Sequence, residues 1–214
     1  MALSKVDYNS LNVTAAASKA LKWNSGADGF ETGDIAGGLV LLETQTASSS
    51  ATLSFTSNID STYDEYVFRF YDIHPETNGA DFTFQADTGT NTSYKQTMTT
   101  TMFWAQHKED GTDAAVEYRG DLDQAQGTAF QTFLHDIGNG NDESGSGYLH
   151  LFNPSSTTFV KHFMTEGSTY DQSDYNKHHF VAGYINTTTA ITTVQFKMST
   201  GDTDAGVIKL YGIS

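Results

Sequence analysis

The chain contains no cysteine and few basic residues, and both shortages limit what it can do. Without cysteine it can form no disulfide, no thiolate metal site and no cysteine nucleophile. Lysine and arginine number 11 against 26 acidic residues, and the only arginines are Arg69 and Arg119, so the formal charge is -15. Neutralising phosphates requires the opposite balance, which argues against nucleic acid and anionic membranes as partners.

Long apolar runs are also missing. No run approaches the roughly 20 residues that span a bilayer, and the N-terminal sequence MALSKVDYNSLNV lacks the apolar core of a secretory signal. We therefore expect a soluble protein without a Sec-type signal. Charged residues make up only 17% of the chain, so Thr, Ser, Asn, Gln and Gly must cover most of the surface, as is typical of β-proteins.

From Gly37 onward, apolar and polar residues alternate with the period of a β-strand. In the segment 65–73 the alternation places apolar residues on both faces, which predicts a central strand. In the segment 81–86 we expect Phe82 to point inward and Thr83 and Gln85 to point outward. The predicted strands are 38–46, 51–56, 65–73, 81–86, 94–106, 147–153, 158–167, 177–186, 192–199 and 206–213.

About ten strands joined by short polar turns predict an all-β fold, a single antiparallel jelly-roll-like β-sandwich over residues 36–214. The segment 106–145 interrupts the rhythm, and we interpret it as long loops around a short strand or helix. No repeat of solenoid or propeller period is visible.

Residues 1–35 differ from the rest and predict a mostly irregular N-terminal arm. The stretch TAAASKAL, residues 14–21, favours one or two helical turns, and chain breakers follow it from Asn24 to Gly29. Such an arm could strap its own domain or dock on a neighbouring subunit. We expect deletion of residues 1–35 to leave a folded domain.

The phrase HLFNPSSTTFVKHF, residues 150–163, combines two histidines with a pair of serines. If residues 153–156 form a tight hairpin loop, the period of two places His150 and His162 on opposite faces, where they cannot share a metal. A longer, odd-numbered loop would let them share one face. The serines lack the G-x-S-x-G context of a nucleophile, and turn formation explains them.

The other candidate metal sites are weaker. The adjacent His178 and His179 must point to opposite faces of a strand, so they cannot form a ligand pair. The acidic loops 136–144 and 202–206 offer carboxylates among glycines, but neither matches the calcium-loop pattern. His74, His107 and His135 belong to no metal motif. We predict no catalytic residues, no cofactor and no metal.

Aromatic residues give a different candidate, a face that contacts carbohydrate. Exposed aromatics within 103–118 or 170–184 would supply the contacts. A pair of carboxylates for glycoside hydrolysis cannot be selected from the sequence.

Several phrases together resemble a group of structural proteins encoded by tailed phages, particularly marine phages of cyanobacteria. They are LVLLETQTASSSATLSFTS, LDQAQGTAFQT, LHLFNPSSTTFVKHF and VAGYINTTTAITTVQFKMSTGDTDAGVIKLYGI, and the resemblance covers roughly residues 38–213. A weaker likeness lies at 10–31. The resemblance implies a virion, tail or fibre component, and it carries no catalytic motif.

From these observations we expect a non-enzymatic virion structural protein, assembled in the bacterial host cytoplasm and exposed on the particle as a tail or fibre component. Its partners would be other virion proteins and copies of itself, by analogy a trimer, with the arm as the assembly element. The alternatives are a capsid-decorating protein and a carbohydrate-binding module that contacts the host envelope.

Overall fold

The computed structural model describes residues 20–33 and 38–213. Contacts divide the chain into two units, which separate between Gly38 and Leu39. The predicted domain boundary after residue 35, and most of the predicted helical stretch at 14–21, lie outside the described residues.

The first unit contains a β-hairpin. Strand β1 (Ala20–Trp23) pairs antiparallel with β2 (Phe30–Gly33), and the amide of Asn24 donates to the carbonyl of Gly29 at 3.0 Å to close the turn. The expectation of an irregular or helical arm is therefore wrong for these residues. The Asn and Gly residues that we interpreted as chain breakers form the turn between two strands.

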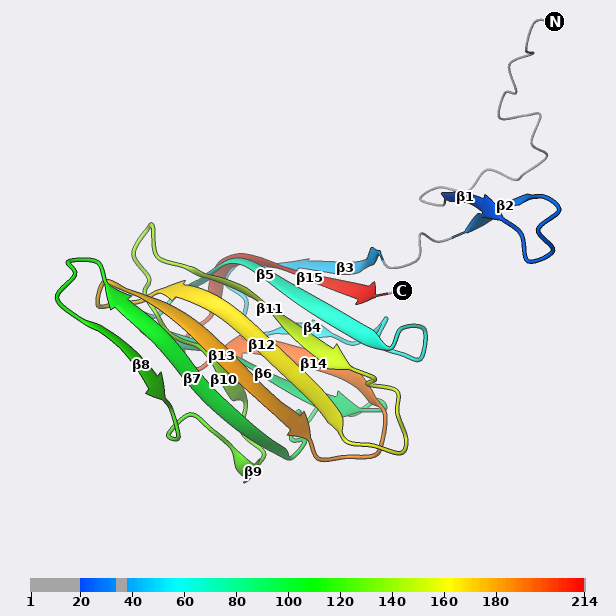
Figure 1. Cartoon of the computed structure of the whole chain (residues 1–214). Helices are drawn as coiled ribbons and strands as arrows, with labels where there is room; N and C mark the ends of the chain where they lie inside the picture. The colour runs from blue at the N-terminus through cyan, green and yellow to red at the C-terminus, as the bar shows by residue number, and fades with distance from the viewer. Residues whose placement is uncertain (1–19, 34–37, 214) are drawn as a thin grey trace, which may run out of the picture. The chain divides into compact units, whose positions relative to one another are not determined.

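The second unit is an antiparallel β-sandwich of two unequal sheets, and the described residues contain no helix (Figure 1). We call the nine-stranded sheet the large sheet and the four-stranded sheet the small sheet. Along the large sheet the strand order is β3 (Leu39–Thr46), β15 (Thr203–Ile213), β5 (Glu65–Pro75), β11 (Gly145–Phe152), β12 (Lys161–Tyr170), β13 (Tyr175–Ile185), β7 (Met98–Lys108) and β8 (Ala114–Tyr118), with β9 (Ala125–Gly127) also on β7. The small sheet has the order β10 (Gln131–Ile137), β6 (Ala80–Thr88), β14 (Ile191–Met198) and β4 (Leu53–Phe55).

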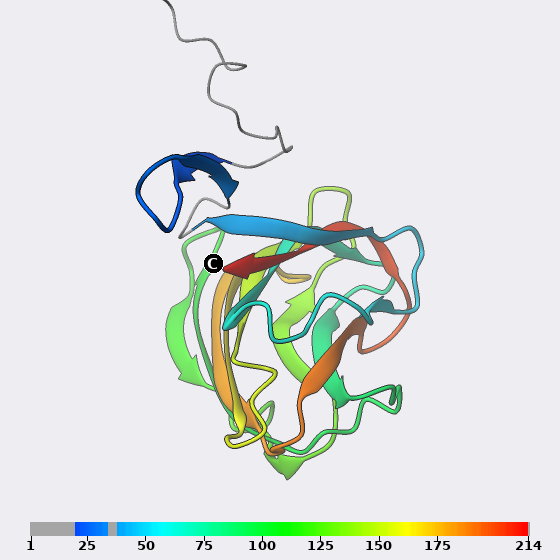
Figure 2. The same ribbon diagram turned by 90° about the vertical axis from the view of Figure 1, so that its right-hand side faces the viewer.

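The predicted all-β sandwich is confirmed. The chain passes repeatedly from one sheet to the other, since β3, β5, β7 and β15 lie in the large sheet and β4, β6 and β14 lie in the small one, and the two layers are visible in Figure 2. Each predicted strand is present, and β5 lies between β15 and β11 as its two apolar faces predicted.

Aromatic rings fill the space between the sheets. Phe68 and Phe70 from the large sheet meet Phe196 from the small sheet, each with a centroid separation of 5.2 Å. Burying one such side chain contributes about 2 to 3 kcal/mol, and edge-to-face pairs add to that figure. The phenylalanines buried in this core are Phe55, Phe68, Phe70, Phe82, Phe84, Phe133, Phe163 and Phe196.

The segment 106–145 contains more structure than its sequence pattern predicts. It contributes β8, β9 and β10, and β10 forms one edge of the small sheet. Phe133 and Leu134 are adjacent and both buried, and register shifts interrupt the pairing of β10 with β6. These irregularities hide the period of two. Glycine makes room for β10, because a Cβ at Gly167 would lie 2.5 Å from Cδ2 of Leu134.

The outer face of the small sheet is polar but buried. Phe82 points into the core and Thr83 and Gln85 point outward, as predicted, but Thr83 and Gln85 are only 4% and 0% exposed. The amide of Gln85 donates to the carbonyls of Gln96 and Ala129 at 3.0 and 2.9 Å. These outward side chains are buried because loops of the same chain cover this face and supply the hydrogen bonds that a buried amide needs.

Candidate functional site

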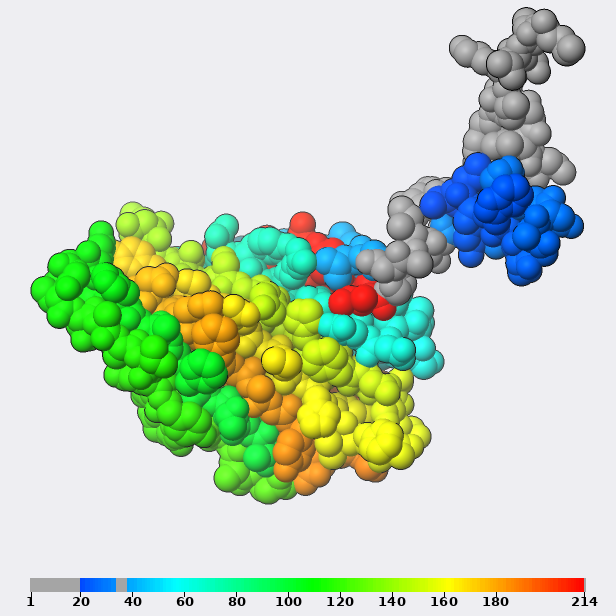
Figure 3. Space-filling model, viewed as in Figure 1, coloured from blue at the N-terminus to red at the C-terminus, as the bar shows by residue number. Residues whose placement is uncertain are grey.

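The outer face of the large sheet is the candidate site, because no part of the second unit covers it and aromatic residues are exposed on it. Phe103 is 43% exposed, Tyr148 36% and Met164 55%. Figure 3 looks onto the strands that form it. We call this surface the open face and define it by the outward-pointing residues Thr101, Phe103, Tyr148, His150, Phe152, His162, Met164, Glu166, His178, Phe180, Ala182 and Tyr184.

Strand register places these side chains in rows across the sheet. Glu166 of β12 lies opposite Tyr148 of β11 on one side and Phe180 of β13 on the other. Phe180 lies opposite Phe103 of β7, and their rings stack with centroids 4.9 Å apart and an interplanar angle of 10°. Directly opposed residues on neighbouring strands are close enough for such contacts. The row therefore joins an aromatic pair to a carboxylate and a phenol.

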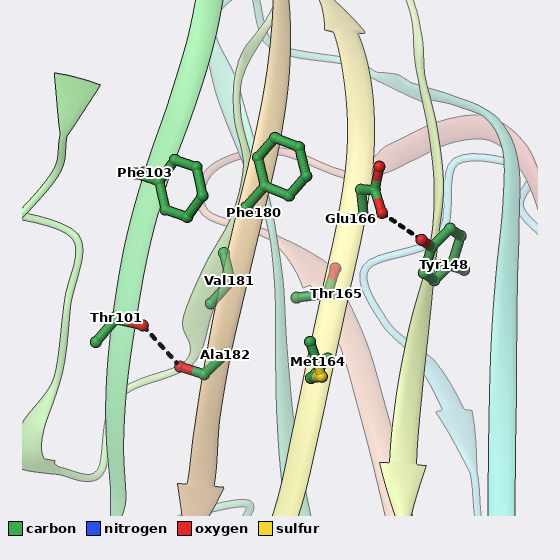
Figure 4. Close-up of a pocket in the computed structure, with 9 residues that line it drawn as sticks. All are labelled: Thr101, Phe103, Tyr148, Met164, Thr165, Glu166, Phe180, Val181 and Ala182. Carbon is green, nitrogen blue, oxygen red and sulfur yellow. Dashed lines mark hydrogen bonds between the residues drawn. The ribbon is translucent and has the colours of Figure 1, made fainter. Parts of the chain in front are cut away.

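A hollow of about 240 Å³ lies beside this row (Figure 4). Ala182 lies at its base, between Met164 and Thr101, because its small side chain leaves space that its neighbours enclose. We call it the Phe180 hollow. Its lining residues are Thr101, Phe103, Tyr148, Met164, Thr165, Glu166, Phe180, Val181 and Ala182.

Glu166 is held in place by two donors. The hydroxyl of Tyr148 donates to its Oε2 atom, and Nε2 of His178 lies 2.8 Å from its Oε1 atom. The hydrogen bond from Tyr148 is the main reason that the pKa of Glu166 is lowered, and the same bond raises the pKa of Tyr148. The carboxylate thus remains an ionised acceptor at the rim of the hollow, with further lone-pair positions unused by these two donors.

The hairpin phrase at 150–163 adopts the longer loop. Leu151 pairs with Phe163 and His150 with Met164, a register that places His150 and His162 on the same face. The tight-loop prediction of opposite faces is therefore wrong. His150 forms an ion pair with Glu65, while the His162 ring lies edge-on to Tyr184. The described residues contain no group of three His, Asp or Glu side chains that could hold a metal.

His178 and His179 point to opposite faces of β13, as predicted. His178 lies on the open face, whereas His179 is fully buried between the sheets. Burial, together with the charges of His135 and Lys177, lowers the pKa of His179 to about 3. Its Nε2 atom accepts a hydrogen bond from the amide of His135 at 3.3 Å.

A buried ionic cluster adjoins His179, and the sequence pattern did not reveal it. Lys177, whose side chain is 7% exposed, lies 2.6 Å from Asp171 and 3.2 Å from Asp136. His135 lies 3.8 Å from Asp81 and packs against Trp104 with centroids 5.0 Å apart. Asp171 and Asp136 therefore compensate the charge of Lys177, as a buried charge requires.

The acidic loops hold each other in place through protein partners. Glu143 accepts a hydrogen bond from the amide of Gly140 within the loop 136–144. His74 joins the two loops, because its Nε2 atom lies 3.2 Å from the carbonyl oxygen of Gly140 and its Nδ1 atom 3.6 Å from Asp204. His107 lies elsewhere, on β7 opposite Asn176.

The aromatic ranges suggested for carbohydrate contact do reach the open face. Phe103 and Phe180 lie there as a stacked pair, and Tyr118 lies opposite Phe103 on β8. The sequence did not identify Tyr148 or Glu166 as their neighbours. Those two residues come from strands whose pairing depends on the length of the 153–160 loop, so composition gave no signal for them.

Comparison of the chain with protein-family models, with curated proteins and with solved structures found no match in any of the three. Within the described ranges no helix is long and apolar enough to cross a membrane.

Proposed function

We propose that the chain is a non-enzymatic structural subunit of a phage particle, a surface-exposed tail or fibre component. Its sandwich displays the open face, and its N-terminal unit attaches it to neighbouring virion proteins. The open face carries the proposal: it is an aromatic sheet surface that the second unit of the chain leaves uncovered. Exposed apolar surface of this kind marks interaction sites.

The hairpin supports the proposed attachment. Trp23 is 61% exposed, Phe30 38% and Leu21 44%, and the Trp23 and Phe30 rings stack with centroids 4.4 Å apart. A two-stranded hairpin alone is at best marginally stable in water. Burial of this aromatic pair against another virion subunit would supply the apolar contact that the hairpin lacks by itself.

A double substitution in the full chain, Trp23→Ser with Phe30→Ser, tests the attachment. We expect the protein to fold normally and to be lost from purified particles, at least tenfold below wild type by quantitative mass spectrometry. Ser25→Ala, in the turn of the same hairpin, is the matched control and should incorporate normally. Normal incorporation of the double variant would contradict the attachment role.

The copy number from the same measurement distinguishes the two structural alternatives. A few to a few tens of copies per particle would support a tail or fibre component. Hundreds of copies would support a capsid-decorating protein instead. Absence of the wild-type chain from particles would overturn both.

A further inference from the structure

The Phe180 hollow combines two kinds of surface that serve different parts of one ligand. The stacked rings of Phe103 and Phe180 form an apolar wall, and Met164 adds a further apolar side. Glu166 adds a charged acceptor at the rim. Pockets that bind small molecules are mostly apolar with a few fixed polar groups that set orientation. The hollow has this composition on a small scale.

The ligand chemistry follows from these groups. The apolar wall fits a ring whose face carries only C–H groups. Glu166 fits donors, and a charged acceptor binds hydroxyl groups more strongly than a neutral one does. The chain carries a formal charge of -15, and the carboxylate lies inside the site, so an anionic ligand would be repelled. A neutral ring with an apolar face and hydroxyl groups on its edge meets all three requirements: it packs on the apolar wall, it donates to Glu166 and it is not repelled by the negative charge.

We propose that the Phe180 hollow binds a pyranose ring of a neutral glycan. The C–H groups of the sugar pack in the hollow against Phe180 and Met164, and two neighbouring hydroxyl groups donate to the carboxylate of Glu166. Tyr148 and His178 act as positioning residues, since each fixes one oxygen of that carboxylate. The site goes beyond the structural role proposed above and does not depend on it.

An extended peptide fits the same surface less well. β12 and β13 are each paired on both sides, so their backbone groups are already used and no strand can be added there. Recognition at the hollow must therefore use side-chain faces and the carboxylate, which are the contacts a sugar ring uses.

A second copy of the chain also fits less well. The open face and the neighbouring strand β5 carry ionisable groups, including Glu166 beside His178 and Glu65 beside His150. Arg69 lies opposite Tyr148 in the row of the hollow. Charged residues are depleted from the centres of protein interfaces, and a copy seated on this face would bury these groups.

The test is a titration of the full-length protein with sugars, in which NMR monitors the methyl groups of Ala182 and Met164. The probes are methyl glycosides of glucose, galactose and mannose, with N-acetylglucosamine, and glucuronic acid serves as the anionic comparison. A neutral glycan array run in parallel extends the range. We expect saturable shifts at Ala182 and Met164 with at least one neutral sugar, and a weaker response to glucuronic acid.

Variants on the open face locate the site. Ala182→Leu fills the hollow and should abolish the response, and Glu166→Gln should weaken binding about tenfold. Phe159→Ala is the control, because Phe159 is 69% exposed but lies outside the hollow. Thermal unfolding of each variant verifies its fold, and the wild-type titration stands even if a variant fails to fold.

Two outcomes would overturn the proposal. One is the absence of shifts with every probe together with a blank array. The other is a concentration-dependent dimer that Phe180→Ala disrupts, which would assign the open face to a second copy of the chain. Neither outcome would affect the incorporation test, so failure of the sugar site and failure of the structural role can be told apart.

Discussion

The outer faces of the two sheets differ in what covers them. The face of the small sheet is polar, yet Gln85 and Asp87 are 0% and 1% exposed because loops of the same chain cover them. The face of the large sheet carries Phe103, Tyr148 and Met164, yet it is open. The polar residues of one face are therefore buried and the aromatic residues of the other are exposed, which is the reverse of the usual distribution. Polar residues under a loop are structural here, and exposed aromatics mark the surface available to a partner.

If burial under loops is what distinguishes the two faces, Asp87→Ala should cause the largest loss of stability. Asp87 accepts hydrogen bonds from the amides of Thr88 and Tyr94, both at 2.8 Å, and from Gln96 at 2.9 Å. Although burial opposes it, these bonds lower the pKa of Asp87. Removal leaves buried donors unpaired, so we expect a loss of about 3 kcal/mol in the free energy of unfolding, measured with urea at pH 7.

Asp110→Ala is the matched control for this loss. Asp110 also accepts hydrogen bonds, from the amide and hydroxyl of Thr112 at 2.9 and 2.6 Å, but it lies in an exposed loop. We expect a much smaller change than at Asp87, because solvent can replace the lost acceptor. Equal losses at the two aspartates would show that cover does not explain the stability of the small-sheet face.

The next effect separates the inner face of the large sheet from its open face. The pKa of buried His179 is lowered to about 3, whereas a histidine in the unfolded chain titrates near pH 6.5. As the pH falls below 6.5, the unfolded chain therefore binds a proton that the folded protein does not bind. The contribution of neutral His179 to the stability of the fold is present above pH 6.5 and is lost as the pH falls toward 3. The loss approaches about 1.4 kcal/mol per pH unit.

His179→Gln should remove this part of the acid sensitivity while keeping an acceptor for the amide of His135. The neighbouring His178, with a side chain 42% exposed, is the control, and His178→Gln should leave most of the acid loss in place. Urea unfolding at several pH values between 3 and 7 measures both slopes. An unchanged slope for His179→Gln would contradict the assignment.

The smallest effect is expected on the open face. Phe103→Ala removes the stack with Phe180 but opens no cavity in the core, so we expect a loss of about 1 kcal/mol. Val116→Ala, at a position that is 75% exposed, should change stability less. A loss at Phe103 as large as that at Asp87 would mean that the open face belongs to the folded core.

Alternation in the sequence was enough to predict ten of the strands, β3 to β7 and β11 to β15, and the inward face of several of them. In β5, Tyr66, Phe68 and Phe70 point into the core because the period of two holds from residue 66 to 70, before the register shift that follows Phe70. The adjacent His178 and His179 follow the same rule. These are local consequences of strand geometry, and they need no knowledge of what packs above the strand.

Other features depend on parts of the chain that are distant in sequence. Gln85 is buried by the segments that contain Gln96 and Ala129, and no pattern within β6 indicates that cover. The register of β11 with β12 follows from the 153–160 loop, whose length the sequence left open. The Phe180 hollow could not be predicted for the same reason, because Tyr148 and Glu166 lie opposite each other only in that register.

The most direct test of the proposed virion role is a cryo-electron microscopy reconstruction of particles of the phage that this proposal takes to encode the chain. We predict density for the sandwich on the tail or a fibre, with the hairpin against another virion protein and the open face toward solvent. An open face buried against a neighbouring subunit, or particles without this chain, would contradict the claim.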